Sequence, residues 1–131
     1  MYRVNAPREM NETFARAFNT RNVNNLLDLF EANARLRPGE SETTRTGIED
    51  IGAELQGLLQ TPGRMVSRNN FCIEHDDIAL LRADWALVDP GDNVLVSGSS
   101  AEIIRRQPDG SWRYVIDHAA GASLPRCLKA E

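Results

Sequence analysis

Asp117 and His118 stand together at the end of an apolar stretch and are well suited to proton transfer. Imidazole has an ordinary pKa close to neutrality, so His118 could act as a general base held by a carboxylate. The preceding residues of the same parity are all apolar or aromatic: Trp112, Tyr114 and Ile116. This alternation predicts that His118 faces the apolar side of a strand and Asp117 the opposite side. The alternative is a structural histidine beside a surface carboxylate.

Patterns typical of a metal centre, a catalytic triad or a nucleotide-binding loop are absent from the sequence. His75 and His118 are the only histidines, and no pair of candidate ligands has HxH or HxxxH spacing. No serine lies in a GxSxG motif, and no glycine run opens a helix after a strand. Fourteen of the fifteen basic residues are arginine, which disfavours Schiff-base chemistry. We therefore expect neither a metal nor a cofactor.

Length and composition fit one soluble domain. The 131 residues predict a single domain over 1–131, with 119–131 as a candidate tail. Nineteen acidic residues against fifteen basic ones give a net charge of -4, without a basic block, so we expect no nucleic-acid partner. No apolar run approaches the ~20 residues of a membrane span. Cys72 and Cys127 are too few for a disulfide framework, which favours a cytoplasmic location.

The first half of the chain predicts three helices. Pro7 suits a first helical turn, and the apolar residues after it recur at helical spacing. Asn22 can cap a second helix, which we expect to end near Asn33. A third helix begins at about Gly47, where acidic residues in the first turn favour the helix dipole. Residues 34–46 are rich in turn formers and threonine, which predicts two short extended segments between these helices.

From Met65 onward the apolar residues recur with a period of two, which predicts four antiparallel strands. Residues 78–88 alternate most clearly, and Trp85 lies on their apolar side. Residues 94–106 form one long strand, in which the small residues at 97–100 permit a bend or bulge. Helices followed by a curved sheet predict an α+β domain in which the sheet wraps around the helices and encloses a pocket.

Short motifs follow one another in a distinctive order and spacing. They are ARAFNTRN at 15–22, LLDLF at 26–30, RPG at 37–39, GI at 47–48, DIALL at 77–81 with Trp85, and RRQPDGSW at 105–112 leading to Asp117 and His118. Over about residues 8–120 they resemble the SnoaL-like and ketosteroid-isomerase-like group of the nuclear transport factor 2 superfamily. The resemblance implies a cystatin-like α+β barrel: a cone-shaped, curved antiparallel sheet wrapped around three N-terminal helices. Such proteins usually dimerise through the sheet, and many have no assigned activity.

The resemblance also implies roles that can be tested residue by residue. Steroid isomerases of this group use an aspartate base near the first extended segment, and a tyrosine with a protonated aspartate as oxyanion donors. Matching the motifs places Arg37 at the base, Phe14 at the tyrosine and Glu102 at the acid. A guanidinium cannot take a proton from carbon and a phenyl ring cannot donate a hydrogen bond, so we do not expect that mechanism. Glu102 remains a candidate acid, or else an exposed cross-strand partner of an arginine.

The shape that the resemblance implies predicts an apolar pocket for a small organic ligand. Its candidate lining residues are Phe14, Phe18, Phe30, Arg37 and Trp85, although the four aromatic ones are by default core residues. If Arg37 points inward, its guanidinium favours an anionic or carbonyl-bearing ligand.

We therefore expect a cytoplasmic homodimer that binds a small organic ligand and has neither a nucleic-acid nor a membrane partner. One alternative is a lyase or isomerase acting on a small carbonyl or polyketide-like compound, with Glu102, Asp117 or His118 in proton transfer. Another is a dimerisation module without a ligand. An enzyme should show titratable groups converging in a water-poor cavity, a binder a closed apolar cavity, and a module a filled one.

Overall fold

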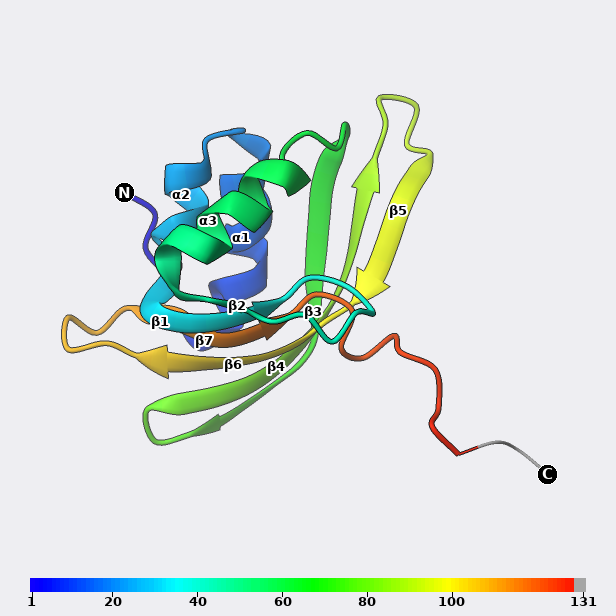
Figure 1. The fold of residues 1–131 in the computed structure, drawn as a ribbon. Coiled ribbons are helices and arrows are strands. Elements are labelled where there is room, and N and C mark those ends of the chain that lie inside the picture. The colour runs from blue at the N-terminus through cyan, green and yellow to red at the C-terminus, as the bar shows by residue number, and fades with distance from the viewer. Residues whose placement is uncertain (129–131) are drawn as a thin grey trace.

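The computed structural model describes residues 1–128, in which helices pack on one face of a curved sheet (Figure 1). The elements are η1 Pro7–Glu9, α1 Met10–Asn19, α2 Val23–Leu27, β1 Phe30–Arg37, β2 Arg45–Thr46, α3 Gly47–Leu58, β3 Arg64–His75, β4 Ile78–Val88, β5 Val94–Ser99, β6 Ala101–Arg106 and β7 Trp112–His118. The predicted α+β class is confirmed. The last three residues of the expected tail lie outside the described residues.

Local signals set where α2 and α3 begin. The Asn22 side chain accepts a hydrogen bond from the backbone N–H two residues later, at 3.0 Å, and so caps α2. Helix α3 begins at Gly47, whose φ of +81° is the left-handed conformation that glycine adopts most easily. The Asp50 carboxylate accepts a hydrogen bond from the N–H of Thr46 at 3.0 Å. An acidic side chain in this first turn also suits the helix dipole.

Helix α2 is shorter than the sequence predicts. It ends at Leu27 instead of near Asn33, and the chain enters β1 at Phe30. The cause is a parallel pairing with β7, in which Phe30 lies opposite Tyr114. Contacts with a strand from the far end of the chain override the local helical pattern, because packing outweighs intrinsic propensity.

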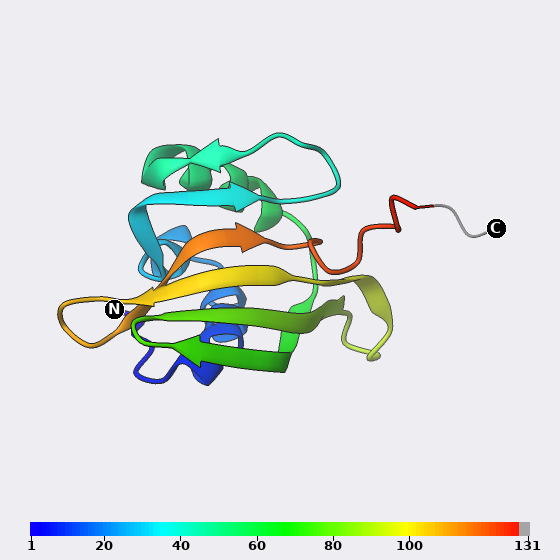
Figure 2. The same cartoon turned by 90° about the horizontal axis from the view of Figure 1, so that it is seen from below.

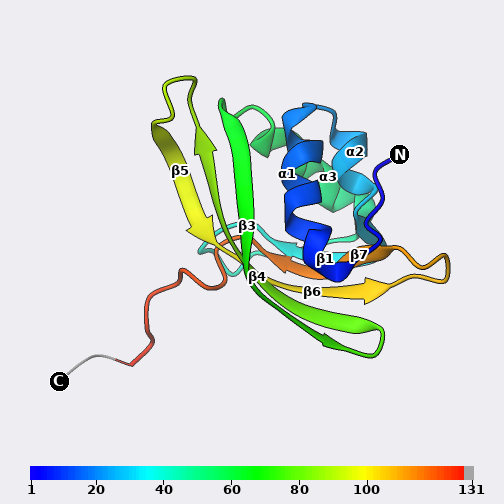
Figure 3. The same ribbon diagram turned by 180° about the vertical axis from the view of Figure 1, so that it is seen from behind.

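Within residues 1–128 the seven strands have the order β2-β1-β7-β6-β4-β3, and β5 pairs with β4. Every pairing is antiparallel except β1 with β7, so the sheet is mixed, whereas the sequence analysis expected an antiparallel one. Figure 2 shows β1, β7, β6 and β4 side by side. Figures 1 and 3 show the sheet bending where β4 passes from β6 to β5, with the helices inside the bend.

The long strand predicted over 94–106 is divided at Ser100 into β5 and β6. The Ser100 hydroxyl accepts a hydrogen bond from the N–H of Ala83 at 2.9 Å, where β4 changes partners. Nearby, the indole of Trp85 lies against Gly98, at which an added Cβ would come within 2.7 Å of Trp85 Cζ2. The small residues at 97–100 thus allow the bend that the sequence predicts, and five strands follow α3 instead of four.

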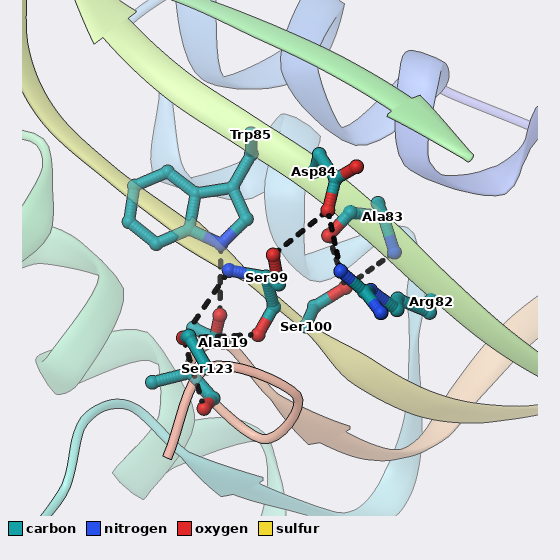
Figure 4. Close-up of polar contacts among 9 residues, drawn as sticks. Arg82, Ala83, Asp84, Trp85, Ser99, Ser100, Ala119 and Ser123 are labelled. Carbon is teal, nitrogen blue, oxygen red and sulfur yellow. Dashed lines mark hydrogen bonds and ion pairs between the residues drawn. The ribbon is translucent and has the colours of Figure 1, made fainter. Parts of the chain in front are cut away.

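The chain does not leave the domain immediately after β7 (Figure 4). The carbonyl oxygen of Ala119 accepts a hydrogen bond from Trp85 Nε1 at 2.8 Å. The N–H of Ala122 donates to the carbonyl of Ser99 at 3.0 Å, and the Ser123 hydroxyl contacts the same backbone. Residues 119–123 of the expected tail are therefore held against β4 and β5.

The core lies between the helices and the concave face of the sheet. Its largest fully buried side chains include Met10, Phe18, Leu26, Ile51, Leu81, Leu87, Ile104 and Tyr114. Among residues 1–128, no helix has the length and apolar character needed to cross a membrane.

The outer face of the sheet exposes large apolar side chains. Ile116, Leu80 and Ile73 are 45%, 43% and 58% exposed. With Ile103 they form one row across β7, β6, β4 and β3. Contiguous exposed apolar surface of this kind is typical of interaction sites. Dimerisation through the strands after Met65 stays a prediction, and this row is where we expect the contact.

We expect Leu80→Asp to convert a dimer of this chain into a monomer, because it buries a charge at the centre of the apolar row. Light scattering at micromolar concentration measures the mass. The matched control is Leu128→Asp, the same change at a residue that is 71% exposed beyond the sheet, and it should leave the mass unchanged. A monomer mass for the unaltered protein, or a dimer that survives Leu80→Asp, would rule out this interface.

We expect Gly98→Ala to destabilise the fold by roughly 1–3 kcal/mol, because the new methyl group overlaps the Trp85 indole and must displace it. Urea denaturation followed by circular dichroism gives the free energy of unfolding. Gly39→Ala is the control, since its added Cβ has no atom within 4 Å and should change stability little. Equal stability of the two variants would show that the indole does not occupy this position in solution.

Candidate functional site

Glu102 and Asp117 lie side by side on the concave face of the sheet. Glu102 in β6 is the direct cross-strand neighbour of Asp117 in β7, and such neighbours have Cβ atoms ~4.5–5.5 Å apart. The two residues, called here the carboxyl pair, are only 4% and 6% exposed. The structure therefore brings together two of the three predicted proton-transfer residues. Glu102 is not the exposed partner of an arginine that the sequence analysis gave as the alternative.

A β-bulge at Val115 decides which side chains of β7 face the helices. The pairing of β7 with β6 shifts by one residue between Tyr114 and Ile116, so Val115 has no partner in β6. Beyond the bulge Ile116 is exposed and Asp117 is buried. The prediction that His118 faces inward and Asp117 outward is wrong, because the extra residue reverses the alternation on which it depended.

A chain of hydrogen bonds connects Glu102 to the helical layer. Tyr114 Oη donates to Asn11 Oδ1 at 2.6 Å, and Asn11 Nδ2 donates to Glu102 Oε1 at 3.2 Å. Asn11 Nδ2 also donates to Asn69 Oδ1 of β3, at 3.0 Å. No hydrogen bond from a described residue reaches the Asp117 carboxyl, for which burial is the dominant influence. Within the carboxyl pair, Glu102 is therefore held by a hydrogen bond from Asn11, whereas Asp117 has no hydrogen-bond partner among the described residues.

The carboxyl pair lies in the wall of a cavity of about 320 Å³ between α3 and the sheet. Most of the wall is apolar, and its residues come from both helices and strands: Phe14, Leu36, Pro38, Leu55, Leu58, Met65, Ala83, Trp85 and Ala119. The polar residues of the wall are Asn11, Glu54, Ser67, Ser100, Glu102, Tyr114 and Asp117. Side chains do not fill this space.

Burial changes the acid–base behaviour of these groups. Loss of water, followed by repulsion from Asp117, raises the pKa of Glu102 to about 8, although hydrogen bonds from Ser100 and Asn11 oppose the change. Burial raises the pKa of Asp117 to about 7, and holds the pKa of the Tyr114 phenol well above its usual range. The carboxyl pair therefore retains at least one proton near neutrality and can both donate and accept one.

Arg37 and His118 do not line the cavity. They pair with each other at the ends of β1 and β7, and the Arg37 guanidinium donates to the hydroxyl of Thr44 at 3.1 Å. Burial, together with the charge of Arg37, lowers the pKa of His118, and neither ring nitrogen has a hydrogen-bond partner among the described residues. The predicted carboxylate contact of His118 is thus wrong, and so is the premise that Arg37 points inward.

The four predicted aromatic residues divide into two groups. Phe14 and Trp85 line the cavity. Phe18 and Phe30 do not, because both are fully buried in the core. The Phe30 ring packs on the Tyr114 ring, with centroids 5.0 Å apart, and Phe18 lies beneath the guanidinium of Arg21.

Asn11 and Tyr114 are site residues that the sequence analysis missed. Asn11 is a polar residue at helical spacing from Phe14 and Phe18, in the middle of an otherwise apolar stripe, and this was an available signal. Tyr114 shares its parity with the apolar residues of its strand, so alternation assigns it to the core and gives no role to its hydroxyl. Within residues 1–128, no group of three His, Cys, Asp or Glu side chains could hold a metal ion.

Comparison with solved structures shows the fold. A candidate calcium/calmodulin-dependent protein kinase type II association domain from Thiobacillus denitrificans is 17% identical, with a TM-score of 0.76, covering 89% of this chain and 95% of that one. A cystatin-like protein of unknown function from Nostoc punctiforme is 21% identical, with a TM-score of 0.75, covering 89% and 90%. A ketosteroid isomerase-like protein from Erwinia carotovora atroseptica is 13% identical, with a TM-score of 0.68, covering 86% and 90%.

A further similar structure is an NTF-2-like protein of unknown function from Shewanella oneidensis. The chain therefore has the fold of the nuclear transport factor 2 superfamily, as the sequence motifs predict. No protein-family model and no curated protein sequence matches the chain.

We expect Glu102→Gln to stabilise the protein, and we expect its gain in free energy of unfolding to increase as the pH rises. In the native protein the carboxyl stays protonated up to about pH 8, whereas in the unfolded chain it ionises near 4.5. Raising the pH through this window therefore lowers the free energy of unfolding of the unaltered protein, by up to about 1.4 kcal/mol per pH unit. The variant has no carboxyl at this position, so it does not show this decrease. Urea denaturation of both proteins between about pH 5 and about pH 8 measures the difference.

Asp89→Asn is the control for this measurement. Hydrogen bonds from Asn93 lower the pKa of Asp89 below 3.8, so its stabilising effect is lost only as the pH falls below that value. The stability difference for this variant should be constant over the same range. A constant difference for Glu102→Gln as well would mean that Glu102 is ionised in the native protein.

Proposed function

We propose that the protein binds a small, largely apolar organic molecule in the cavity and holds its polar group at the carboxyl pair. The observation that carries this proposal is Asp117: its carboxyl is buried, belongs to the cavity wall and has no hydrogen bond to a described residue. Burying a polar group without a partner costs free energy, and a ligand that contacts Asp117 would recover part of it.

The size and walls of the cavity support the same proposal. Ligand pockets have volumes of about 300–1,000 Å³, apolar and aromatic walls and a few converging polar groups. The cavity of about 320 Å³ fits the lower end of this range. Phe14 and Trp85 supply aromatic surface, while Glu102 and Asp117 supply the converging polar groups. A cytoplasmic location belongs to the proposal, since Cys72 and Cys127 are both free.

Proton transfer is a second candidate function, favoured by the adjacency of two carboxyls that can exchange protons near neutrality. Asp117, without a hydrogen bond, would act as the base, and Glu102, held by Asn11, as the acid. The reaction would be a lyase or isomerase step on a small carbonyl or polyketide-like compound. Arg37 lies outside the cavity wall, so the base would come from β7 and not from the first strand.

The proposal is tested by filling the cavity. We expect Ala83→Leu, which adds three carbon atoms inside the cavity, to weaken binding of small fluorescent probes by about tenfold or more. Three compounds with the same aromatic body are tried, naphthylmethylamine, naphthalenemethanol and naphthoic acid, and the loss is measured for each one that the unaltered protein binds. Equilibrium fluorescence titration gives each dissociation constant, and circular dichroism checks that the variant is folded.

Ala86→Leu is the matched control, because it adds the same atoms on the opposite face of β4, at a residue outside the cavity wall. It should leave binding unchanged. If no probe binds, or if both variants weaken binding equally, the cavity is not the binding site and the proposal fails.

A further inference from the structure

The charged residues of the cavity wall are all acidic. Glu102 and Asp117 are buried side by side, and Glu54 of α3 contributes a third carboxylate. No lysine, arginine or histidine of the described residues belongs to the wall. Glu54 is already paired with a cation, because the Arg45 guanidinium contacts its carboxylate at 3.1 Å from outside the wall. The carboxyl pair has no such cationic partner among the described residues of the wall.

We propose that the ligand is an organic amine, bound as a cation with its nitrogen at the carboxyl pair and its apolar part against Phe14 and Trp85. This inference rests on the proposed small-molecule binding and names the chemical class of the ligand. It reverses the expectation of an anionic or carbonyl-bearing ligand, which required an inward-pointing Arg37.

Hydrogen-bonding capacity favours an ammonium group at this position. Ionised carboxylates only accept hydrogen bonds, and an ammonium group only donates them. Asp117 receives no donor from the described residues, and Glu102 Oε1 receives one from Asn11. One nitrogen can reach both carboxyls, because the two residues are direct cross-strand neighbours. Hydrogen bonds between charged groups are about twice as strong as those between neutral ones.

The same cavity wall disfavours an anionic ligand. Its charge would lie beside two buried carboxyls with no cationic side chain in the wall to neutralise it. The amide and phenol donors of the wall are also committed, since Tyr114 Oη donates to Asn11 and Asn11 Nδ2 donates to Glu102 and Asn69. Among the described wall residues this leaves the hydroxyl groups of Ser67 and Ser100, which carry no charge to balance that of a carboxylate or phosphate.

The pH dependence of binding separates an amine from a neutral carbonyl compound. The titratable groups facing the nitrogen are Glu102 of β6, Asp117 and Tyr114 of β7, and Glu54 of α3. In the empty cavity burial keeps protons on the carboxyl pair, and an ammonium group must displace them. Amine binding therefore strengthens as the pH rises and releases protons. A carbonyl compound needs the protonated carboxyls as donors, so its binding weakens as the pH rises.

The experiment compares the three naphthalene probes over about pH 6.5–8.5, where the amine stays largely protonated. We expect naphthylmethylamine to bind at least about tenfold more tightly than naphthalenemethanol at the upper end, with its affinity rising with pH. Naphthoic acid should not bind. Calorimetry in two buffers of different ionisation enthalpy should show proton release when the amine binds. Equal affinity of amine and alcohol, amine binding that weakens with pH, or binding of the acid would overturn the inference.

Asp117→Asn should weaken amine binding by about tenfold or more and leave alcohol binding nearly unchanged. The matched control is Asp84→Asn, which removes an exposed carboxylate outside the cavity wall and should affect neither. If Asp117→Asn does not fold, Glu102→Gln serves in its place, and proton release by the unaltered protein tests the inference without any variant.

Failure of this inference differs from failure of the proposed function. If the alcohol binds as tightly as the amine and Ala83→Leu weakens both, small-molecule binding stands and the amine assignment falls. If none of the three probes binds, both fall.

Discussion

The hydrogen bonds of Asn11 fix the position of helix α1 on the sheet. One amide side chain contacts Tyr114 of β7, Glu102 of β6 and Asn69 of β3. Asn69 lies opposite Ala83, where β4 changes partners, so these contacts hold one turn of α1 against β7, β6 and the bend of the sheet. Buried polar groups must find partners at defined distances, and they therefore restrict geometry more strongly than apolar contacts do. The cavity remains on the side of the sheet that faces α3.

The carboxyl pair opposes the stability of the fold. Two adjacent carboxyls are removed from water, and only one of them has a hydrogen-bond partner among the described residues. Apolar residues at both positions would avoid this cost. Groups whose burial lowers stability are common where a site must bind or react, because the same desolvation makes them responsive to a ligand.

Elements determined by local sequence were predictable, whereas elements determined by distant pairing were not. Pro7, Asn22 and the acidic first turn of α3 all mark helix starts that the structure confirms. The end of α2 could not be found in this way, because Phe30 belongs to β1 through its pairing with β7. In the site, Glu102 came from a motif match, while Asn11 was detectable as a polar residue in an apolar stripe.

The bulge at Val115 determines which chemical group this strand presents to the cavity. The sequence around it contains no glycine or other signal that marks a bulge, so the alternation rule gave the wrong face beyond Tyr114. If the strand were regular instead, Ile116 and His118 would face inward and Asp117 outward. The same sequence at the end of β7 can therefore present either the carboxyl of Asp117 or the imidazole of His118 to the cavity, depending on whether the bulge is present. For proteins of this fold, a single insertion or deletion in the last strand could therefore exchange one chemistry for another without changing any residue that performs it.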